Sequence, residues 1–550
     1  MINIYQLLPR LFCNANGKNI ENGTIEENGC GKLNSMTAKV LNDIRKQGYT
    51  HIWTTGVIEH ATKTDYTKHG IDKDHEGVVK GQAGSPYAIK DYYDIDPDLA
   101  ENVEKRMEEF ESLIERTHKA SLALIIDFVP NHVARHYHSD AKPKRTTDLG
   151  AKDDTTKAFD AQNNFYYMPG ERFTPQFDAK GYDEFPAKAT GNDVFSAYPS
   201  VNDWYETVKL NYGVDYCGGR TQHFDPTPDT WKKMKDILMF WAKKGVDGFR
   251  CDMAEMVPVE FWHWAIAEVK KKYPSIIFIA EVYNPDQYRN YIHHGGFDYL
   301  YDKVGLYDTL RAATRQETSA SSITGSWQAV DDIQSHMLNF LENHDEQRIA
   351  SDFFAGDGRN AIAALIVSAT LSSAPFMVYA GQEFGERGMD KEGFSGRDGR
   401  TTIFDYWKVD TLSRWHSKQL TEQESELQSI YRTVLNLRAK EPALMEGSKR
   451  YDLQWLNFDN PDYDDHRVYS YFRQSADGKE TLLVAVNFGE QDADVSINIS
   501  SHAMEYLILK EKTYKCKDLL SGKQWSQKLC ADEKLALQIP AKSGVIVKMK

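Results

Sequence analysis

A repeated alternation of short apolar runs with longer amphipathic stretches is the feature that most constrains the fold, and it extends to about residue 445. Residues 121–128 (SLALIIDF) are almost wholly apolar, as in a strand that is buried on both faces. Stretches with apolar residues at helical spacing, such as residues 259–272, separate these runs. The order predicts an α/β fold in which helices cover a parallel sheet. The expected strands are residues 2–8, 51–53, 121–128, 246–250, 276–280, 299–300, 337–341 and 376–379.

Two segments break this alternation. Residues 133–220 are rich in Asp, Lys, Gly, Pro and aromatic residues and show no clear period. Because a structureless loop of that length is unusual in a compact domain, we expect a small inserted domain there. From about residue 446 the pattern changes to period-two runs separated by turn residues, which predicts an antiparallel β-sandwich. These runs are residues 467–473, 481–487, 494–499 and 544–548.

The formal net charge of −15 over 550 residues restricts the partners of the chain. Phosphate contacts need a basic surface, so this charge disfavours nucleic-acid binding and docking on anionic lipid. A neutral substrate needs no counter-charge and is compatible with it. No window of about 20 apolar residues predicts a membrane span. No basic segment followed by an apolar run marks a signal peptide, so we expect a cytoplasmic protein, or a periplasmic or secreted one if a leader has been trimmed. The oligomeric state stays open.

Polar residues follow four of the apolar strands at the point where each strand ends. A single carboxylate there is equally well explained as a helix N-cap, and a single histidine as a buried hydrogen-bonding group. The four groups are better explained together, because the carboxyl ends of barrel strands meet at one face, where active sites are built. The segments are Asp127-Phe-Val-Pro-Asn131-His132, Gly248-Phe-Arg250-Cys-Asp252, Ile277-Phe-Ile-Ala-Glu281 and Leu341-Glu-Asn343-His344-Asp345.

In this order, the four segments resemble the four signature regions of the α-amylase family of glycoside hydrolases. Residues 85–93 (SPYAIKDYY) and 379–385 (YAGQEFG) resemble two further segments of that family. The resemblance covers nearly the whole chain. It implies a (β/α)8 TIM barrel with an inserted domain B after the third strand and a C-terminal antiparallel β-sandwich domain. The implied parts are residues 1–132 and 221–445 for the barrel, 133–220 for domain B and 446–550 for the sandwich.

The resemblance also implies the roles of three carboxyl groups. Asp252 is identified as the nucleophile, Glu281 as the general acid/base and Asp345 as the group that grips sugar hydroxyls. Retaining hydrolysis needs one ionised and one protonated carboxyl. Arg250 lies two residues before Asp252 on the same strand face, so its charge should lower the pKa of Asp252. The apolar strand before Glu281 and the second carboxylate nearby favour the protonated form of Glu281.

Substrate-binding residues are implied in the same way. Tyr87 is expected to stack on the sugar at the cleavage point, and His132 and His344 are expected to bind its hydroxyls. Arg250 completes the predicted substrate-binding set. Asp127 is expected to be structural and to orient Arg250.

The resemblance does not extend to the acceptor side of the site or to a bound metal ion. Residues 253–256 (MAEM) stand where many members of the family have a Lys-His pair that holds the acceptor side of the substrate. No cofactor is required for the chemistry, and calcium is a possible ligand with Asn131 as a weak candidate. Residues 14–19 and 72–74 offer oxygen atoms at calcium-like spacing, but solvated turns explain them equally.

Three functions are compatible with these residues. The leading interpretation is hydrolysis of α-1,4-glucosidic bonds in starch-type glucans or maltooligosaccharides. The alternative is a transglycosylase of the glucanotransferase or maltosyltransferase type, since hydrolysis and transfer share a covalent intermediate and differ in what captures it. The third is a non-catalytic carbohydrate-binding relative, which the presence of all three acids argues against.

Overall fold

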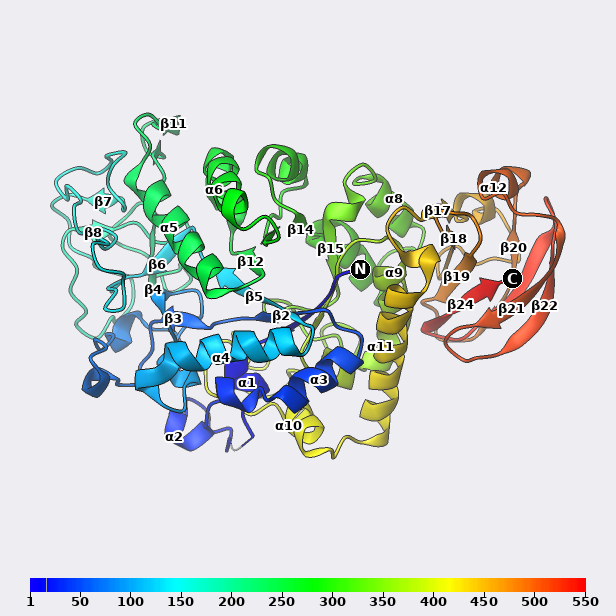
Figure 1. Ribbon diagram of the computed structural model, residues 1–550, viewed down its shortest axis with the longest axis horizontal. Coiled ribbons are helices and arrows are strands. Elements are labelled where there is room, and N and C mark those ends of the chain that lie inside the picture. The colour runs from blue at the N-terminus through cyan, green and yellow to red at the C-terminus, as the bar shows by residue number, and fades with distance from the viewer. Residues whose placement is uncertain (16) are drawn as a thin grey trace.

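The computed structural model describes residues 1–15 and 17–550, and its centre is a closed barrel of eight parallel strands (Figure 1). Around the barrel the strands follow their order in the chain, and Asn3 pairs with Phe376 where the last strand meets the first. The predicted (β/α)8 barrel is therefore confirmed. The barrel strands are β1 (Asn3–Leu7), β2 (His51–Thr54), β5 (Ala123–Phe128), β12 (Gly248–Cys251), β13 (Ile277–Ala280), β14 (Tyr299–Tyr301), β15 (Met337–Phe340) and β16 (Phe376–Tyr379).

Helices surround this barrel, and local sequence signals fix where several of them begin. The longest begins after Thr421, whose hydroxyl accepts from the amide of Glu424 while the Glu424 carboxylate accepts from the amide of Thr421. The helices are α1 (Pro9–Phe12), α2 (Ile25–Asn28), α3 (Ala38–Lys46), α4 (Arg106–Lys119), α5 (Asp229–Lys244), α6 (Val259–Lys272), α7 (Asp308–Thr314), α8 (Ser322–Gln328), α9 (Ile362–Thr370), α10 (Asp410–Ser417), α11 (Glu422–Lys440) and α12 (Ser501–Tyr506).

Two additions extend the face of the barrel at which the strands end. The first is an antiparallel hairpin of β3 (Ile58–His60) and β4 (Ile89–Ile95) in the segment between β2 and α4, which the sequence pattern does not reveal. The second is the inserted segment, residues 133–220, which we call domain B. Domain B and its borders contain mostly irregular chain with short strands, namely β6 (His132–Ala134), β7 (Tyr167–Met168), β8 (Ala187–Lys188), β9 (Thr207–Lys209), β10 (Val214–Asp215) and β11 (Thr221–Gln222).

The C-terminal part is the predicted antiparallel β-structure and lies at one end of the molecule (Figure 1). A six-stranded sheet packs against a two-stranded sheet over a separate apolar core. The larger sheet contains, in spatial order, β17 (Lys449–Asp452), β18 (Val468–Gln474), β19 (Thr481–Asn487), β24 (Ser543–Met549), β21 (Lys512–Asp518) and β22 (Gln524–Leu529). The smaller sheet contains β20 (Ala493–Asn498) and β23 (Lys534–Ile539).

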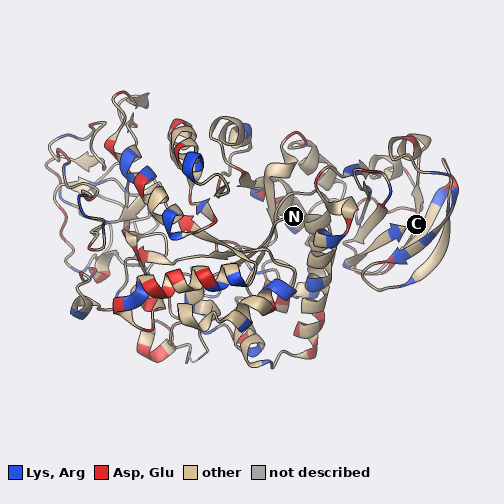
Figure 2. Ribbon diagram, viewed as in Figure 1, with Lys and Arg blue, Asp and Glu red and all other residues tan. Residues whose placement is uncertain are grey.

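Helix α9 joins this domain to the barrel. All nine of its residues are buried, and the amide of Ala363 donates to the carbonyl of Lys542 next to β24. On the outer helices, by contrast, acidic and basic side chains alternate, as on α4 (Figure 2). Among the described residues, no helix has both the length and the apolar composition needed to cross a membrane.

Candidate active site

The polar groups that follow the barrel strands meet at a cavity of about 350 Å³. Five of the seven predicted site residues line it, namely Tyr87, His132, Asp252, Glu281 and Asp345. The other two, Arg250 and His344, are fully buried beneath it, with exposures of 0% and 1%. The structure thus brings the predicted set together, but it places Arg250 and His344 behind the residues that face the cavity.

Arg250 is the centre of the carboxylate cluster. Its Nη1 atom lies 2.7 Å from Asp252 Oδ1 and 3.4 Å from Asp127 Oδ1. Its Nη2 atom lies 3.0 Å from Glu281 Oε2, although the contact lacks hydrogen-bond geometry. Its Nε donates to Tyr301 Oη at 3.1 Å. One buried cation therefore contacts three carboxylates, with its shortest contact to Asp252, and Asp127 takes the orienting position that the sequence suggested.

The backbone turns sharply just after Asp252. Met253 adopts the left-handed conformation, with φ of 43°, which is uncommon for a residue with a side chain. Its amide donates to Glu281 Oε2 at 2.8 Å, and Tyr283 Oη donates to Glu281 Oε1 at 2.6 Å. The turn and the tyrosine hold both oxygens of the Glu281 carboxyl group in place.

Burial changes the expected ionisation of Asp252. Burial raises its pKa well above the ordinary value, the ion pair with Arg250 opposes that rise, and the charge of Glu281 adds to it. The sequence correctly indicated the direction of the Arg250 contribution, and the larger effect is desolvation of the carboxylate, which the sequence does not reveal. Asp252 and Glu281 both contact the single guanidinium of Arg250.

A second network connects the histidines and the stacking residue. His344 Nδ1 contacts Gln6 Nε2 at 2.8 Å, and His344 Nε2 lies 2.5 Å from Tyr87 Oη and 3.1 Å from Asp345 Oδ2. Both ring nitrogens are therefore engaged, and His344 holds Tyr87 and Asp345 at the cavity wall. His132 lies at the wall itself, with Nε2 3.9 Å from Asp252 Oδ2. Burial lowers the pKa of His132 to about 3, so it is neutral there.

Part of the cavity wall comes from segments that the sequence analysis did not select. Trp204 and Glu206 reach it from domain B, and Phe394 and Phe404 reach it from the segment after β16. Tyr283 also faces it. Of these, only Tyr283 carried a usable signal, because it lies two residues after Glu281. The other four lie in irregular chain without a period that could have indicated their direction.

The surroundings of Asn131 do not suit the binding of calcium. The ammonium group of Lys209 lies 2.5 Å from Asn131 Oδ1, 2.6 Å from Asp193 Oδ1 and 3.3 Å from the carbonyl of Met256. Lys209 is 2% exposed, so its charge is held among these oxygens. A metal ion on Asn131 would have to share this space with a buried cation, which is strongly unfavourable. The cation at this position is therefore the ammonium group of Lys209.

The other two calcium candidates are also occupied by contacts of the protein. Lys90 Nζ contacts Asp74 Oδ2 at 3.2 Å and also binds the carbonyl of Asp72. Of residues 14–19, Asn19 bonds the backbone of Lys408 through its side chain, whereas Asn16 lies outside the described residues. Oxygen atoms of Asp72, Asp74 and Asn19 are therefore engaged in contacts within the chain.

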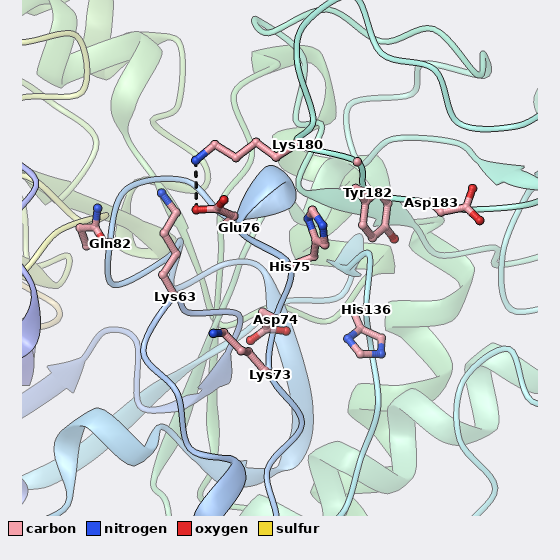
Figure 3. A pocket seen from close by; sticks show the side chains of 11 residues that line it. Lys63, Lys73, Asp74, His75, Glu76, Gln82, His136, Lys180, Tyr182 and Asp183 are labelled. Atoms are coloured by element: carbon pink, nitrogen blue, oxygen red, sulfur yellow. Dashed lines mark ion pairs between the residues drawn. The ribbon is translucent and has the colours of Figure 1, made fainter.

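A larger hollow of about 950 Å³ lies apart from this cavity, and charges of both signs face it (Figure 3). Lys180 Nζ pairs with Glu76 Oε2 across it at 3.0 Å. None of the groups that follow the four strands lines it. Volume alone therefore does not identify the active site, and the smaller cavity is the one that collects the predicted acids.

Known proteins resemble this chain over most of its length. The family model described as "Alpha amylase, catalytic domain" matches residues 6–477. An α-amylase of Streptomyces lividans is 25% identical over 94% of this chain and 56% of its own length, so this chain spans little more than half of that relative. α-Amylase 3 of Dictyoglomus thermophilum is 23% identical over 80% of this chain and 78% of its own length. An α-1,4-glucan:maltose-1-phosphate maltosyltransferase of Cereibacter sphaeroides is 23% identical over 54% and 40%, respectively.

Solved structures show the same fold. A noncanonic maltogenic α-amylase from Thermotoga neapolitana superposes with a TM-score of 0.64 at 18% identity, covering 100% of this chain and 98% of its own. An α-amylase from Geobacillus thermoleovorans, complexed with acarbose, superposes with a TM-score of 0.65 at 17% identity over the same shares. At these identities the likeness supports the fold and not the substrate.

Proposed function

Because the chain belongs to the α-amylase family, we propose that it hydrolyses α-1,4-glucosidic bonds in starch-type glucans or maltooligosaccharides by a retaining double displacement. The observation that carries the proposal is the contact of one buried guanidinium, Arg250, with both Asp252 and Glu281 at the cavity wall. Such a pair separates into an attacking carboxylate and a proton donor, as this chemistry needs.

In the proposed first step, a carboxylate oxygen of Asp252 attacks the anomeric carbon while Glu281 gives its proton to the departing glycosidic oxygen. This forms a covalent glycosyl ester on Asp252. In the second step, Glu281 takes a proton from water, the water oxygen attacks the same carbon, and the ester bond to Asp252 breaks. The hydrogen bond of Arg250 favours the charged form of Asp252 and so supports its role as nucleophile.

The remaining cavity residues are proposed to hold the sugar. Asp345 bonds its hydroxyls, with bonds that strengthen as charge develops at the anomeric carbon. His132 is neutral and can donate or accept a hydrogen bond to a hydroxyl. Tyr87 offers an aromatic surface for stacking. No cation is free in this wall to bind an anionic substrate, since Lys80 pairs with Glu206 at 3.0 Å, and within the described residues this favours a neutral sugar.

Transfer to a sugar is the second candidate, and a specific observation supports it. Several relatives are maltosyltransferases by name. Both reactions share the ester on Asp252, and the acceptor side of the cavity decides whether water or a sugar captures it. Met253 and Trp204 both line the cavity, and Trp204 offers an apolar surface on which a second sugar can lie.

Proton NMR of the first turnovers on maltoheptaose tests the proposal. We expect shorter oligosaccharides whose new reducing end is the α-anomer, because two inversions retain configuration. Release of the β-anomer would contradict the double displacement, and products longer than the substrate would assign the activity to transfer. The Asp252→Asn variant is the control: it keeps the shape of the side chain, and its turnover should fall by about 10⁴-fold or more.

A further inference from the structure

Four carboxylates gather outside the active-site cavity, where the β3–β4 hairpin meets the start of domain B. They are Glu59 on β3, Asp91 and Asp94 on β4, and Asp140 in domain B. One carboxylate oxygen from each lies within 4.8 Å of those of the other three. Glu59, Asp91 and Asp94 are 2%, 0% and 3% exposed, whereas Asp140 is exposed to solvent. Most of this negative charge is therefore withdrawn from water.

The register of the hairpin brings these charges together. Glu59 and Asp91 are direct partners across the antiparallel β3–β4 pair, which is irregular on both sides of Glu59. Side chains of directly paired residues lie on one face of a sheet, and like charges there repel each other. An arrangement of this kind is unfavourable unless something positive lies between the side chains.

Hydrogen bonds from neighbouring groups hold two of the carboxylates in fixed positions. Asp91 accepts from Ser139 Oγ at 2.6 Å and from the amide of Ala141 at 3.1 Å, both on the domain B side. Asp94 Oδ2 accepts from Arg106 Nε at 3.0 Å. Asp91 therefore ties the hairpin to domain B, and Asp94 is neutralised by the first residue of α4.

Glu59 has no such partner. Its Oε2 atom is buried and accepts no hydrogen bond from any described residue. The neighbouring Lys90 pairs with Asp74 instead, and among the described residues the one cation in contact with any of the four carboxylates is Arg106, which pairs with Asp94. A buried carboxylate without a donor or a cation costs several kcal/mol. Glu59 therefore brings a buried, unpartnered oxygen to a group of three other carboxylates, which indicates a missing positive ligand.

We propose that Glu59, Asp91, Asp94 and Asp140 bind a calcium ion. The site offers only oxygen ligands, which suits hard divalent cations. Three of the four carboxylates are buried, so the ion has to exchange most of its water for protein oxygens, which calcium does more readily than magnesium. Tyr87 lies between β3 and β4, two residues before β4 begins, so the ion would fix the segment that carries the stacking residue of the cavity.

A bound proton is the competing explanation. Burial and the charges of Asp91 and Asp94 raise the pKa of Glu59, which favours its protonated form when no cation is bound. The two explanations differ in a measurable way. A calcium ion links the stability of the chain to the calcium concentration, whereas a proton does not.

The test uses the full chain, stripped with EDTA and dialysed, in thermal unfolding and calorimetric titration with CaCl₂ and, separately, MgCl₂. We expect one calcium per chain, a Tm that rises with calcium concentration, and a weaker response to magnesium. Glu59→Gln and Asp140→Asn each remove one ligand charge and should weaken calcium binding by at least about tenfold. Asp140→Asn changes an exposed residue, so it is expected to fold even if Glu59→Gln does not.

Glu108→Gln is the matched control, because it makes the same chemical change at an exposed position on the adjacent helix α4. It should keep the calcium response of the parent chain. No heat and no change in Tm on adding calcium to the parent chain would overturn the proposal in favour of the proton. Calcium binding that both ligand variants retain unchanged would overturn it as well, because the ion would then lie elsewhere.

Discussion

Two buried carboxylate clusters, one beneath the active-site cavity and one on the β3–β4 hairpin, contain the same chemical groups but differ in what lies between them. In the first, Arg250 reaches Asp252, Asp127 and Glu281 at 2.7, 3.4 and 3.0 Å. In the second, within the part of the chain that the structure describes, Arg106 contacts only Asp94, and the buried Oε2 atom of Glu59 accepts no hydrogen bond. The first cluster is completed by a side chain of the protein, and the second is not.

The difference shows how this chain compensates the negative charge of buried carboxylates. A guanidinium is planar and carries five donors, so it can serve several carboxylates at fixed angles. That rigidity suits a reaction centre, where Asp252 and Glu281 must keep their positions. At the Asn131 position a side chain of the protein again supplies the positive charge, because Lys209 lies between oxygens of Asn131 and Asp193. The hairpin cluster is the exception, and the proposed calcium ion would supply the positive charge there.

The largest expected effect comes from breaking the first cluster with Arg250→Lys. An ammonium group is a single point of charge and cannot reach Asp252, Asp127 and Glu281 at once. We expect kcat to fall by about 10²–10³-fold, as for removal of one preorganised donor. We also expect a loss of about 3 kcal/mol or more in the free energy of unfolding, because a buried carboxylate loses its partner. Steady-state kinetics and chemical denaturation measure the two effects.

A matched replacement at an exposed position, Arg145→Lys, makes the same change far from any strand end and should alter neither quantity. Unchanged kcat in Arg250→Lys would show that the guanidinium fork is not needed. Glu281 would then be held by the Met253 amide and Tyr283, and Asp127 by Trp53 and Tyr87.

A smaller effect is expected from Lys209→Met, which removes the built-in cation from the Asn131 position. The change keeps most of the apolar stem and leaves Asp193 and two further oxygens facing an uncharged side chain. We expect a loss of about 3 kcal/mol in the free energy of unfolding. In a Glu59→Gln background, so that the hairpin site does not respond, added calcium should restore part of that loss. Denaturation with and without calcium measures both.

The exposed Lys232→Met is the control for Lys209→Met and should be neutral. A Lys209→Met protein of unchanged stability would mean that the amide and carboxylate oxygens at this position need no cation. The comparison between clusters would then lose one of its three examples.

The sequence predicted the barrel and most of the candidate site because both follow repeating rules. Because they follow barrel strands, Asp252, Glu281 and Asp345 lie at the same face of the barrel regardless of the loop conformations, and all three line the cavity. Helix α9 was missed for a physical reason: it is apolar all round and buried on every side, so it shows no amphipathic period. The hairpin strand β3 was missed because its three residues are too few to show a period-two pattern.

Contacts between distant segments could not be predicted in the same way. The sequence suggested Asn131 as a metal ligand, and nothing in its neighbourhood indicated that Lys209, 78 residues later, would lie against its oxygen. Likewise, Glu59 and Asp91 are 32 positions apart and meet only through the hairpin register. Ionisation also depends on burial, and burial is the largest contribution to the pKa change of Asp252. Local patterns predict elements and their ends, whereas the charge balance of a cluster depends on the folded chain.

The smallest effect is expected from a substitution that makes the hairpin cluster resemble the other two. Asp140→Lys replaces the exposed member of the cluster with a cation that can reach Glu59, as Lys209 reaches Asn131. We expect the calcium response to disappear and the Tm in EDTA to rise by about 1–2 °C, because a partly exposed pair contributes less than about 1 kcal/mol. Asp140→Asn separates loss of the negative charge from gain of the positive one, and its Tm in EDTA should lie between those of the parent and Asp140→Lys. A lower Tm for Asp140→Lys than for Asp140→Asn in EDTA would mean that the cluster does not lack positive charge, because a cation placed beside it then brings no stability.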